Sequence, residues 1–126
     1  MGADVGTRAT AGRGLAARNH QISRVFQALA DPTRRAVVER LALGPASTTE
    51  LARPFNMALP SFAQHLQMLE ECGVVRSRKE GRVRRFHLVP KPLTTAEEWM
   101  VAQRALWNQR LDQLQEYVEG MKTSKP

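Results

Sequence analysis

The segment comprising residues 59–88 constrains the fold most, because the spacing of its apolar side chains changes once, at a glycine. Before that glycine, apolar residues recur at intervals of three and four, which is typical of an amphipathic helix: Leu59, Phe62, Leu66 and Leu69. After Gly73 the chain alternates between apolar and basic residues, and Glu80-Gly81 is a turn signal, so a β-hairpin is predicted. Val83 and Phe86 fall on opposite faces of a regular strand, which leaves open a bulge or another register.

Three helices are predicted before this segment. The first covers about residues 18–30, with an apolar side made of Ile22, Val25, Phe26 and Leu29. Asp31-Pro32 then combines an N-cap with a proline at the first helical position, so a second helix is expected from there to Gly44. Ser47 and Glu50 have the spacing of a capping box, which predicts a short third helix ending near Pro54.

The chain after the hairpin predicts one long helix. Pro90 and Pro92 interrupt the strand, and Thr94 or Thr95 is expected to cap a helix that reaches about Met121. Its apolar residues are spaced four, three, four and three apart: Trp107, Leu111, Leu114, Val118 and Met121. This heptad-like stripe could pack on the protein's own core, but an interface with a second copy is favoured.

Composition narrows the class of partner. The chain has 126 residues, the size of one domain, and its 19 Lys and Arg against 12 Asp and Glu give a net charge of +7. Such an excess favours a polyanion, either nucleic acid or an anionic membrane surface, although charge that serves only solubility is an alternative. No long apolar run or secretory signal is present, so a soluble cytoplasmic protein is expected. The predicted domain is residues 17–121, between a flexible basic tail over residues 1–16 and a short tail over residues 122–126.

Helix, helix, short helix, helix, hairpin and helix, in this order, predict a mainly α, winged helix-turn-helix fold with a small β-hairpin. The helix from Leu59 to Cys72 is then expected to enter the major groove of double-stranded DNA, with a face free of acidic residues. The predicted DNA contacts on this helix are Pro60, Ser61, Gln64, His65 and Met68. The hairpin is expected to lie against phosphates or the minor groove through Arg76, Arg78, Lys79, Arg82, Arg84 and Arg85.

Two blocks, ALADPTRRAVVERLALGPASTTELA and MALPSFAQHLQMLEECGVVRSRKEGRVRRFHL, resemble the ArsR/SmtB family of bacterial winged-helix repressors. The resemblance implies a homodimer that binds an inverted-repeat operator and blocks transcription until a signal releases it. The first and last helices pair in that family, which adds Ile22 and Phe26 to the predicted dimer interface. The family's recognition contacts fall on Ser61, Gln64 and His65, just after Pro60.

The sequence departs from the family pattern in two places. Ala58 stands where the family commonly has a serine at the start of the recognition helix, so a capping hydroxyl is missing. The third helix reads ELARPF, and residues 94–121 contain neither His nor Cys, so the usual metal-sensing sites are absent. No metal and no cofactor are therefore expected, and the chain resembles the metal-free branch of the family.

A second class of function fits the same composition. A non-specific nucleic-acid or nucleoid protein would need the same positive charge without base reading. An enzyme is disfavoured, because no nucleophile with a neighbouring base, phosphate-binding glycine loop or pair of carboxylates stands out. Cys72, the single cysteine, is expected to be a small, partly buried side chain rather than a redox switch.

Overall fold

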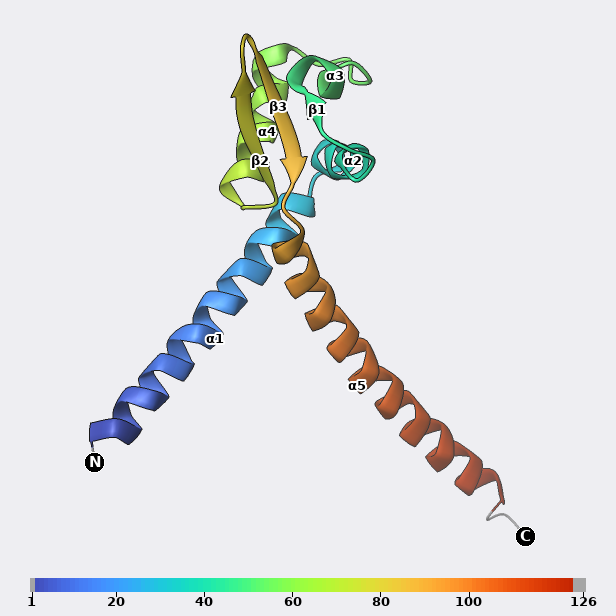
Figure 1. The fold of residues 1–126 in the computed structure, drawn as a ribbon. Helices are drawn as coiled ribbons and strands as arrows, with labels where there is room; N and C mark the ends of the chain where they lie inside the picture. The colour runs from blue at the N-terminus through green and yellow to red at the C-terminus, as the bar shows by residue number, and fades with distance from the viewer. Residues whose placement is uncertain (1, 124–126) are drawn as a thin grey trace. The chain divides into compact units, whose positions relative to one another are not determined.

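The computed structural model describes residues 2–123, and the side chains of residues 12–122. It divides into two compact units, one up to Ala96 and one from Glu97 onward. The elements, in chain order, are α1 (Gly2–Leu29), α2 (Pro32–Leu41), β1 (Ala46–Ser47), α3 (Thr48–Ala52), α4 (Leu59–Glu71), β2 (Val75–Glu80), β3 (Val83–Leu88) and α5 (Pro90–Thr123). The predicted mainly α fold with a β-hairpin is confirmed (Figure 1).

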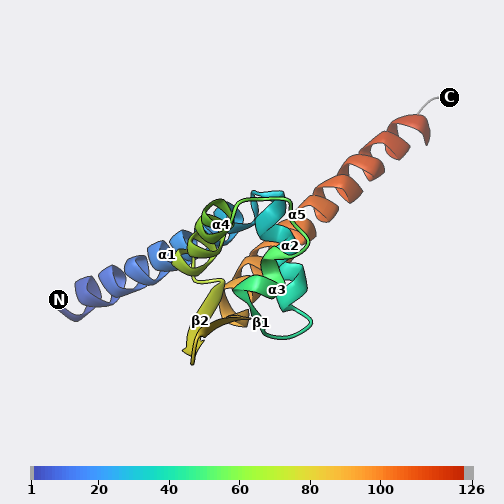
Figure 2. The same cartoon turned by 90° about the horizontal axis from the view of Figure 1, so that it is seen from above.

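The core of the first unit lies between its helices and a small antiparallel sheet. Figure 2, seen from above, shows α2 and α4 on one side of this sheet. Residues in helices supply most of the buried apolar side chains, and Val25, Phe62, Leu66 and Leu69 among them were predicted from helical spacing. The full set of buried apolar side chains is Val25, Ala28, Val37, Leu41, Ala46, Leu51, Phe62, Leu66, Leu69, Cys72, Val74, Val75, Phe86 and Ala96. Burial of this apolar surface is the main force that holds the unit together.

The sheet contains one strand that the sequence did not predict. Its order is β1-β3-β2, and β1 pairs with β3 through Ala46 opposite Phe86 and Ser47 opposite Arg85. A two-residue strand is too short to show an alternating pattern. It attaches the start of α3 to the hairpin, and so holds the helix-turn-helix segment against the wing.

The helix caps predicted around α2 and α3 are present. The Asp31 carboxylate accepts a hydrogen bond from the backbone N–H of Arg34 at 3.0 Å, with Pro32 in the first turn. The Ser47 hydroxyl accepts one from the backbone N–H of Glu50 at 3.1 Å. In return, hydrogen bonds from the Ser47 hydroxyl and backbone N–H lower the pKa of Glu50. The capping box is therefore confirmed.

Both long helices start earlier than predicted. α1 begins at Gly2 rather than near residue 18, so residues 2–16, predicted as a flexible tail, are helical. This segment has four alanines, which favour a helix, and four glycines, which disfavour one, and it has no apolar stripe, so neither propensity nor spacing predicted it. Among the described residues, no helix has the length and apolarity needed to cross a membrane.

The start of α5 corrects the expected cap. α5 begins at Pro90 and includes Pro92, because prolines fit the first turn of a helix, where backbone N–H groups have no helical partner. Thr94 and Thr95 do not cap this helix. Their hydroxyls instead donate back to the carbonyl oxygens of Pro90 and Lys91, each at 3.1 Å.

Candidate nucleic-acid interface

The helix α4 has an uncapped start and a well-defined end. Ala58 occupies the N-cap position with extended backbone, and no side chain caps the helix there. At the other end Gly73 has a φ of 78°, and the backbone N–H groups of Gly73 and Val74 donate to the carbonyl oxygens of Glu70 and Leu69. These two bonds form a Schellman motif. The chain therefore turns directly from α4 into β2.

One side of α4 is anchored in the core. Phe62, Leu66 and Leu69 are buried, and the ring of Phe62 lies 5.4 Å from that of Phe55, centre to centre. Leu59, predicted to belong to the same inner side, is 62% exposed. It lies in the first turn of the helix, where the core no longer covers it, so that part of the prediction is wrong.

The predicted contact residues of α4 divide into two groups. Pro60, Ser61 and Gln64 are exposed. Met68 is half-buried, packs against the core and lies 3.9 Å from the Cys72 sulfur, measured from Sδ to Sγ. The side of α4 that remains exposed is thus rotated away from Met68.

His65 is turned toward the start of α2. Its Nδ1 lies 3.5 Å from Oδ2 of Asp31 and 3.5 Å from Nη1 of Arg34, and 23% of its side chain is exposed. Arg34 in turn donates to the backbone carbonyl oxygens of Ala28 at 2.8 Å and Gln27 at 3.0 Å, at the end of α1. His65 therefore contributes to the junction of α1, α2 and α4.

Gln67 is an exposed polar residue that the sequence interpretation did not select. It follows Gln64 by three positions, and its Nε2 donates to Oε1 of Glu71 at 3.1 Å. Its position one turn along from Gln64 could have identified it, had Met68 been assigned to the inner side. An amide side chain has the donor and acceptor needed to read adenine.

The hairpin is regular, without the bulge that the sequence left open. Glu80 pairs with Val83 across a two-residue turn, and Gly81 has a φ of 65°. Because no non-glycine residue among those described has a positive φ, the turn has the pattern of type II′. Val83 is exposed on the opposite face from Phe86, so their parity requires no irregularity.

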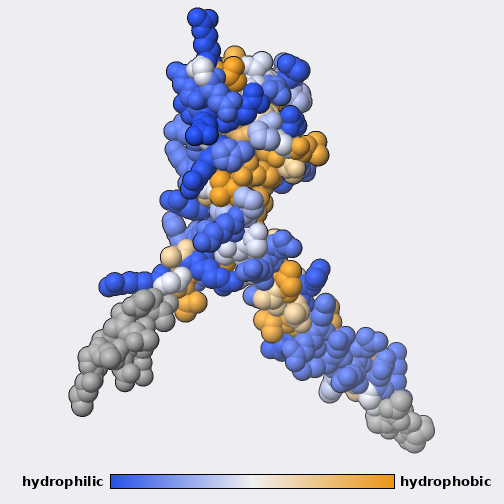
Figure 3. Space-filling model, in the orientation of Figure 1, coloured by the Kyte–Doolittle hydropathy of each residue, from blue (hydrophilic) through white to orange (hydrophobic). Residues whose placement is uncertain are grey.

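The register distributes the basic side chains over both faces of the hairpin. Directly paired residues share a face, so Lys79 and Arg84 lie on the face of the buried Phe86, whereas Arg78 and Arg85 lie on the other. Arg82 is in the turn itself. In Figure 3 the hairpin end of this unit is mostly hydrophilic. The hairpin therefore presents basic side chains on both of its faces.

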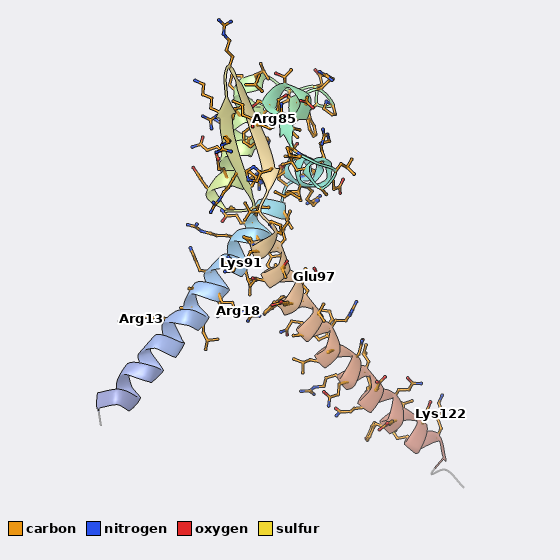
Figure 4. The ribbon with its side chains drawn as sticks, in the orientation of Figure 1. Arg13, Arg18, Arg85, Lys91, Glu97 and Lys122 are labelled. Carbon is orange, nitrogen blue, oxygen red and sulfur yellow. The ribbon has the colours of Figure 1, made fainter. Side chains whose placement is uncertain are left out.

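Two of the predicted contact residues in the hairpin also bond within the protein. Nε of Arg85, which Figure 4 labels on β3, donates to Oε2 of Glu80 at 3.2 Å. Nη1 of Arg84 donates to the Ser77 hydroxyl at 2.9 Å. A guanidinium has five N–H donors, so both arginines keep donors for phosphate oxygens.

The predicted interface residues lie in both units. Ile22 is buried within the first unit, and Phe26 is partly exposed. In the second unit, the described side chains of the heptad-like stripe are all exposed: Trp107, Leu111, Leu114, Val118 and Met121.

Among the residues with described side chains, no group of three or more His, Cys, Asp or Glu is placed to hold a metal ion. Cys72 is buried, which raises the pKa of its thiol.

Comparison with known sequences finds helix-turn-helix regulators. A family model described as a helix-turn-helix domain matches residues 29–78. The HTH-type transcriptional regulator Rv2034 of Mycobacterium tuberculosis is 47% identical over 70 residues, which cover 56% of this chain and 65% of that protein. The transcriptional repressor SdpR of Bacillus subtilis is 30% identical over 80 residues, covering 64% of this chain and 89% of that protein. The chain spans just under two thirds of the length of the first relative and most of the second.

Solved structures of ArsR family regulators are similar in fold to this chain. The crystal structure of an ArsR family transcriptional regulator, RHA00566, is 52% identical with a TM-score of 0.66, and covers 70% of this chain and 91% of that one. The solution structure of a homodimeric winged helix-turn-helix DNA-binding domain, Mb0332 from Mycobacterium bovis, is 29% identical with a TM-score of 0.57. It covers 72% of this chain and 86% of that one.

Proposed function

The chain belongs to the ArsR/SmtB family of winged helix-turn-helix transcriptional regulators, and from this membership we propose that it is a sequence-specific repressor that acts as a homodimer in the cytoplasm. Each protomer places α4 in the major groove of one half of an inverted-repeat operator. The arginine-rich hairpin β2–β3 contacts the neighbouring phosphates or minor groove. The signal that releases the DNA is not a metal held by the usual thiolate or imidazole sites of the family.

The observation that carries this proposal is the exposed amide pair on α4. Gln64 and Gln67 lie exposed on a helix whose other side is locked into the core by Phe62 and Leu66. Base reading requires a side chain that is free to meet base edges and a backbone that does not move when it does. Gln64 meets both conditions, whereas Gln67 would exchange its bond to Glu71 for one to a base. The basic hairpin that follows supplies the sequence-independent attraction to phosphate.

The apolar side chains of α5 support the homodimer. Leu111, Leu114 and Val118 are exposed at heptad-like spacing in the second unit, where exposure of such a stripe to water is unfavourable. A second copy of the same helix offers a matching apolar surface. The homodimeric state of the relative from Mycobacterium bovis agrees with this assignment.

Replacement of one side chain on α4 and one on the hairpin tests the proposal. Gln64→Ala should lower affinity by about 1 to 3 kcal/mol for the preferred base pair and should weaken discrimination at that position. Arg82→Ala should weaken binding to all sequences and reduce the slope of log affinity against log salt by about 1. Titrations of both variants against the preferred duplex, single-base variants of it and an unrelated duplex measure these effects.

The two variants control for each other, because both shorten an exposed side chain of the same unit. An equal loss on every duplex with Gln64→Ala would show that this residue does not read a base. If the unsubstituted chain also bound every duplex equally, the protein would be a non-specific nucleic-acid binder rather than a repressor.

A further inference from the structure

Three side chains from three different elements form a chain of hydrogen bonds between the recognition helix and the wing. Oε1 of Glu70, on α4, accepts from the Ser77 backbone N–H at 2.9 Å and from the Ser77 hydroxyl at 2.6 Å. The Ser77 oxygen, on β2, accepts in turn from Nη1 of Arg84 on β3 at 2.9 Å. The first two distances are in the range of strong, charge-assisted hydrogen bonds.

The position of β2 at the edge of the sheet explains why a side chain from α4 can bond to its backbone. β2 is an edge strand in the order β1-β3-β2, so one of its sides presents N–H groups that no strand pairs with. One of these donors is the backbone N–H of Ser77, which donates to the Glu70 carboxylate. The register places Ser77 opposite Phe86, whose side chain is buried, so Ser77 lies on the face of the hairpin that is turned toward the helices.

Glu71, the next residue on α4, is bonded differently. Its Oε1 accepts from Nε2 of Gln67, a residue of the same helix, and its backbone oxygen accepts from Nη1 of Arg24. Its carboxylate therefore has no described hydrogen bond to the hairpin. The two adjacent glutamates carry the same charge, but of the two only the Glu70 carboxylate has described hydrogen bonds to the hairpin.

We propose that Glu70, Ser77 and Arg84 form a clamp that sets the position of the hairpin relative to α4, so that helix and wing meet the DNA at one fixed spacing. Glu70 and Ser77 are positioning residues, and Arg84 is both a member of the clamp and a phosphate contact. This inference rests on the proposed function, because it assigns a role to the same DNA-binding surface.

The negative charge of Glu70 allows its role in the clamp to be distinguished from its electrostatic repulsion of phosphate. A carboxylate on a helix that enters the groove repels phosphates, so removing its charge should on that ground alone tighten DNA binding. If Glu70 holds the wing, its removal should instead weaken binding, because the hairpin loses its defined position. The two effects have opposite signs.

The test compares variants on a duplex selected by the unsubstituted protein from a random-sequence pool. Ser77→Ala changes no charge, removes two of the three bonds and should weaken binding ~5- to 10-fold. In hydroxyl-radical footprints it should also lose protection of the backbone flanking the site, while discrimination at the base pair read by Gln64 is retained. Thermal unfolding of each variant identifies any that is not folded.

A matched pair of glutamate variants completes the design. Glu70→Ala should weaken binding and lose the flanking protection, whereas Glu71→Ala, which removes the same charge from the next residue, should keep that protection. Glu70→Gln should restore the protection in part, because its amide oxygen still accepts from Ser77. If Glu70 served only to stabilise the fold, Glu70→Gln would restore the flanking protection only to the extent that it restored thermal stability.

The outcomes separate the clamp from the proposed function. If the unsubstituted protein selects and protects no particular duplex, the proposed function is overturned and the clamp with it. If a site is protected but Ser77→Ala and Glu70→Ala leave the flanking protection and affinity as they were, the clamp alone is overturned. Equal tightening by Glu70→Ala and Glu71→Ala would also overturn it, since charge would then account for both.

Discussion

Asp31 shows how a single residue links two helices, because it caps α2 and lies beside α4, the proposed recognition helix. Its carboxylate caps α2 through the Arg34 backbone N–H and lies near the His65 ring on α4. The hydrogen bond from Arg34 lowers the pKa of Asp31, aided by the nearby His65 and Arg34 and opposed by burial. A lowered pKa in the folded state means that the ionised carboxylate stabilises the fold.

This cap predicts a pH-dependent loss of stability. Asp31→Ala should reduce the free energy of unfolding by about 1 kcal/mol near neutral pH, and Asp31→Asn by less, because asparagine also caps helices. The stabilisation is present above the ordinary carboxyl pKa of 3.8 and is lost as pH falls through the lower folded-state pKa. Urea unfolding across this pH range measures it.

Asp31→Asn is the control, since its cap does not titrate. The difference between the native chain and Asp31→Ala should shrink as the pH falls. A difference that stays constant down to strongly acidic pH would mean that the ionised carboxylate is not the source of the stabilisation.

The elements show how far sequence reasoning reaches. Apolar spacing and capping residues were sufficient for α2, α3, α4 and the hairpin, because these signals are local. β1 was missed because its two residues gain their strand conformation only by pairing with β3. The early start of α1 was missed because the glycines of residues 2–16 offset the helix propensity of its alanines, and because no apolar stripe is present there.

The candidate site was predictable at the level of elements but less so for individual side chains. Gln64, Ser61 and Arg82 were placed on exposed positions as expected. His65 and Met68 share helical spacing with Ser61 and Gln64, but their inward orientation depends on contacts with Asp31 and the core, which no spacing rule contains. The bond from Glu70 to Ser77 depends on the edge position of β2, a tertiary feature.

The uncapped start of α4 gives a prediction for a whole element. Ala58 has φ −61° and ψ 139°, an N-cap conformation without a capping side chain. Ala58→Ser should therefore stabilise the protein by about 1 kcal/mol, because its hydroxyl can accept a hydrogen bond from the first turn. Chemical denaturation measures the gain, with Ala58→Val as the control that adds bulk without a capping acceptor. Equal stability of Ala58→Ser and the native chain would show that the first turn does not depend on this cap.

At the scale of the whole molecule, charge and symmetry lead to the same expectation. A net charge of +7 favours binding to any DNA, whereas α4 is the proposed source of sequence preference. In a homodimer the two recognition helices read two half-sites, and these lie one helical turn of DNA apart, about 34 Å. Leu114, exposed in the second unit, is one of the side chains proposed to hold the two copies together.

The central claim is tested most directly by a footprint of the purified protein on the duplex that it selects, with an excess of unrelated duplex as competitor. The account predicts a protected inverted repeat that resists the competitor, with half-sites about one turn apart. Leu114→Glu should lose both half-sites together while the first unit stays folded. Protection that the competitor abolishes, or a single protected half-site that Leu114→Glu leaves unchanged, would contradict the claim that this chain is a dimeric, sequence-specific regulator.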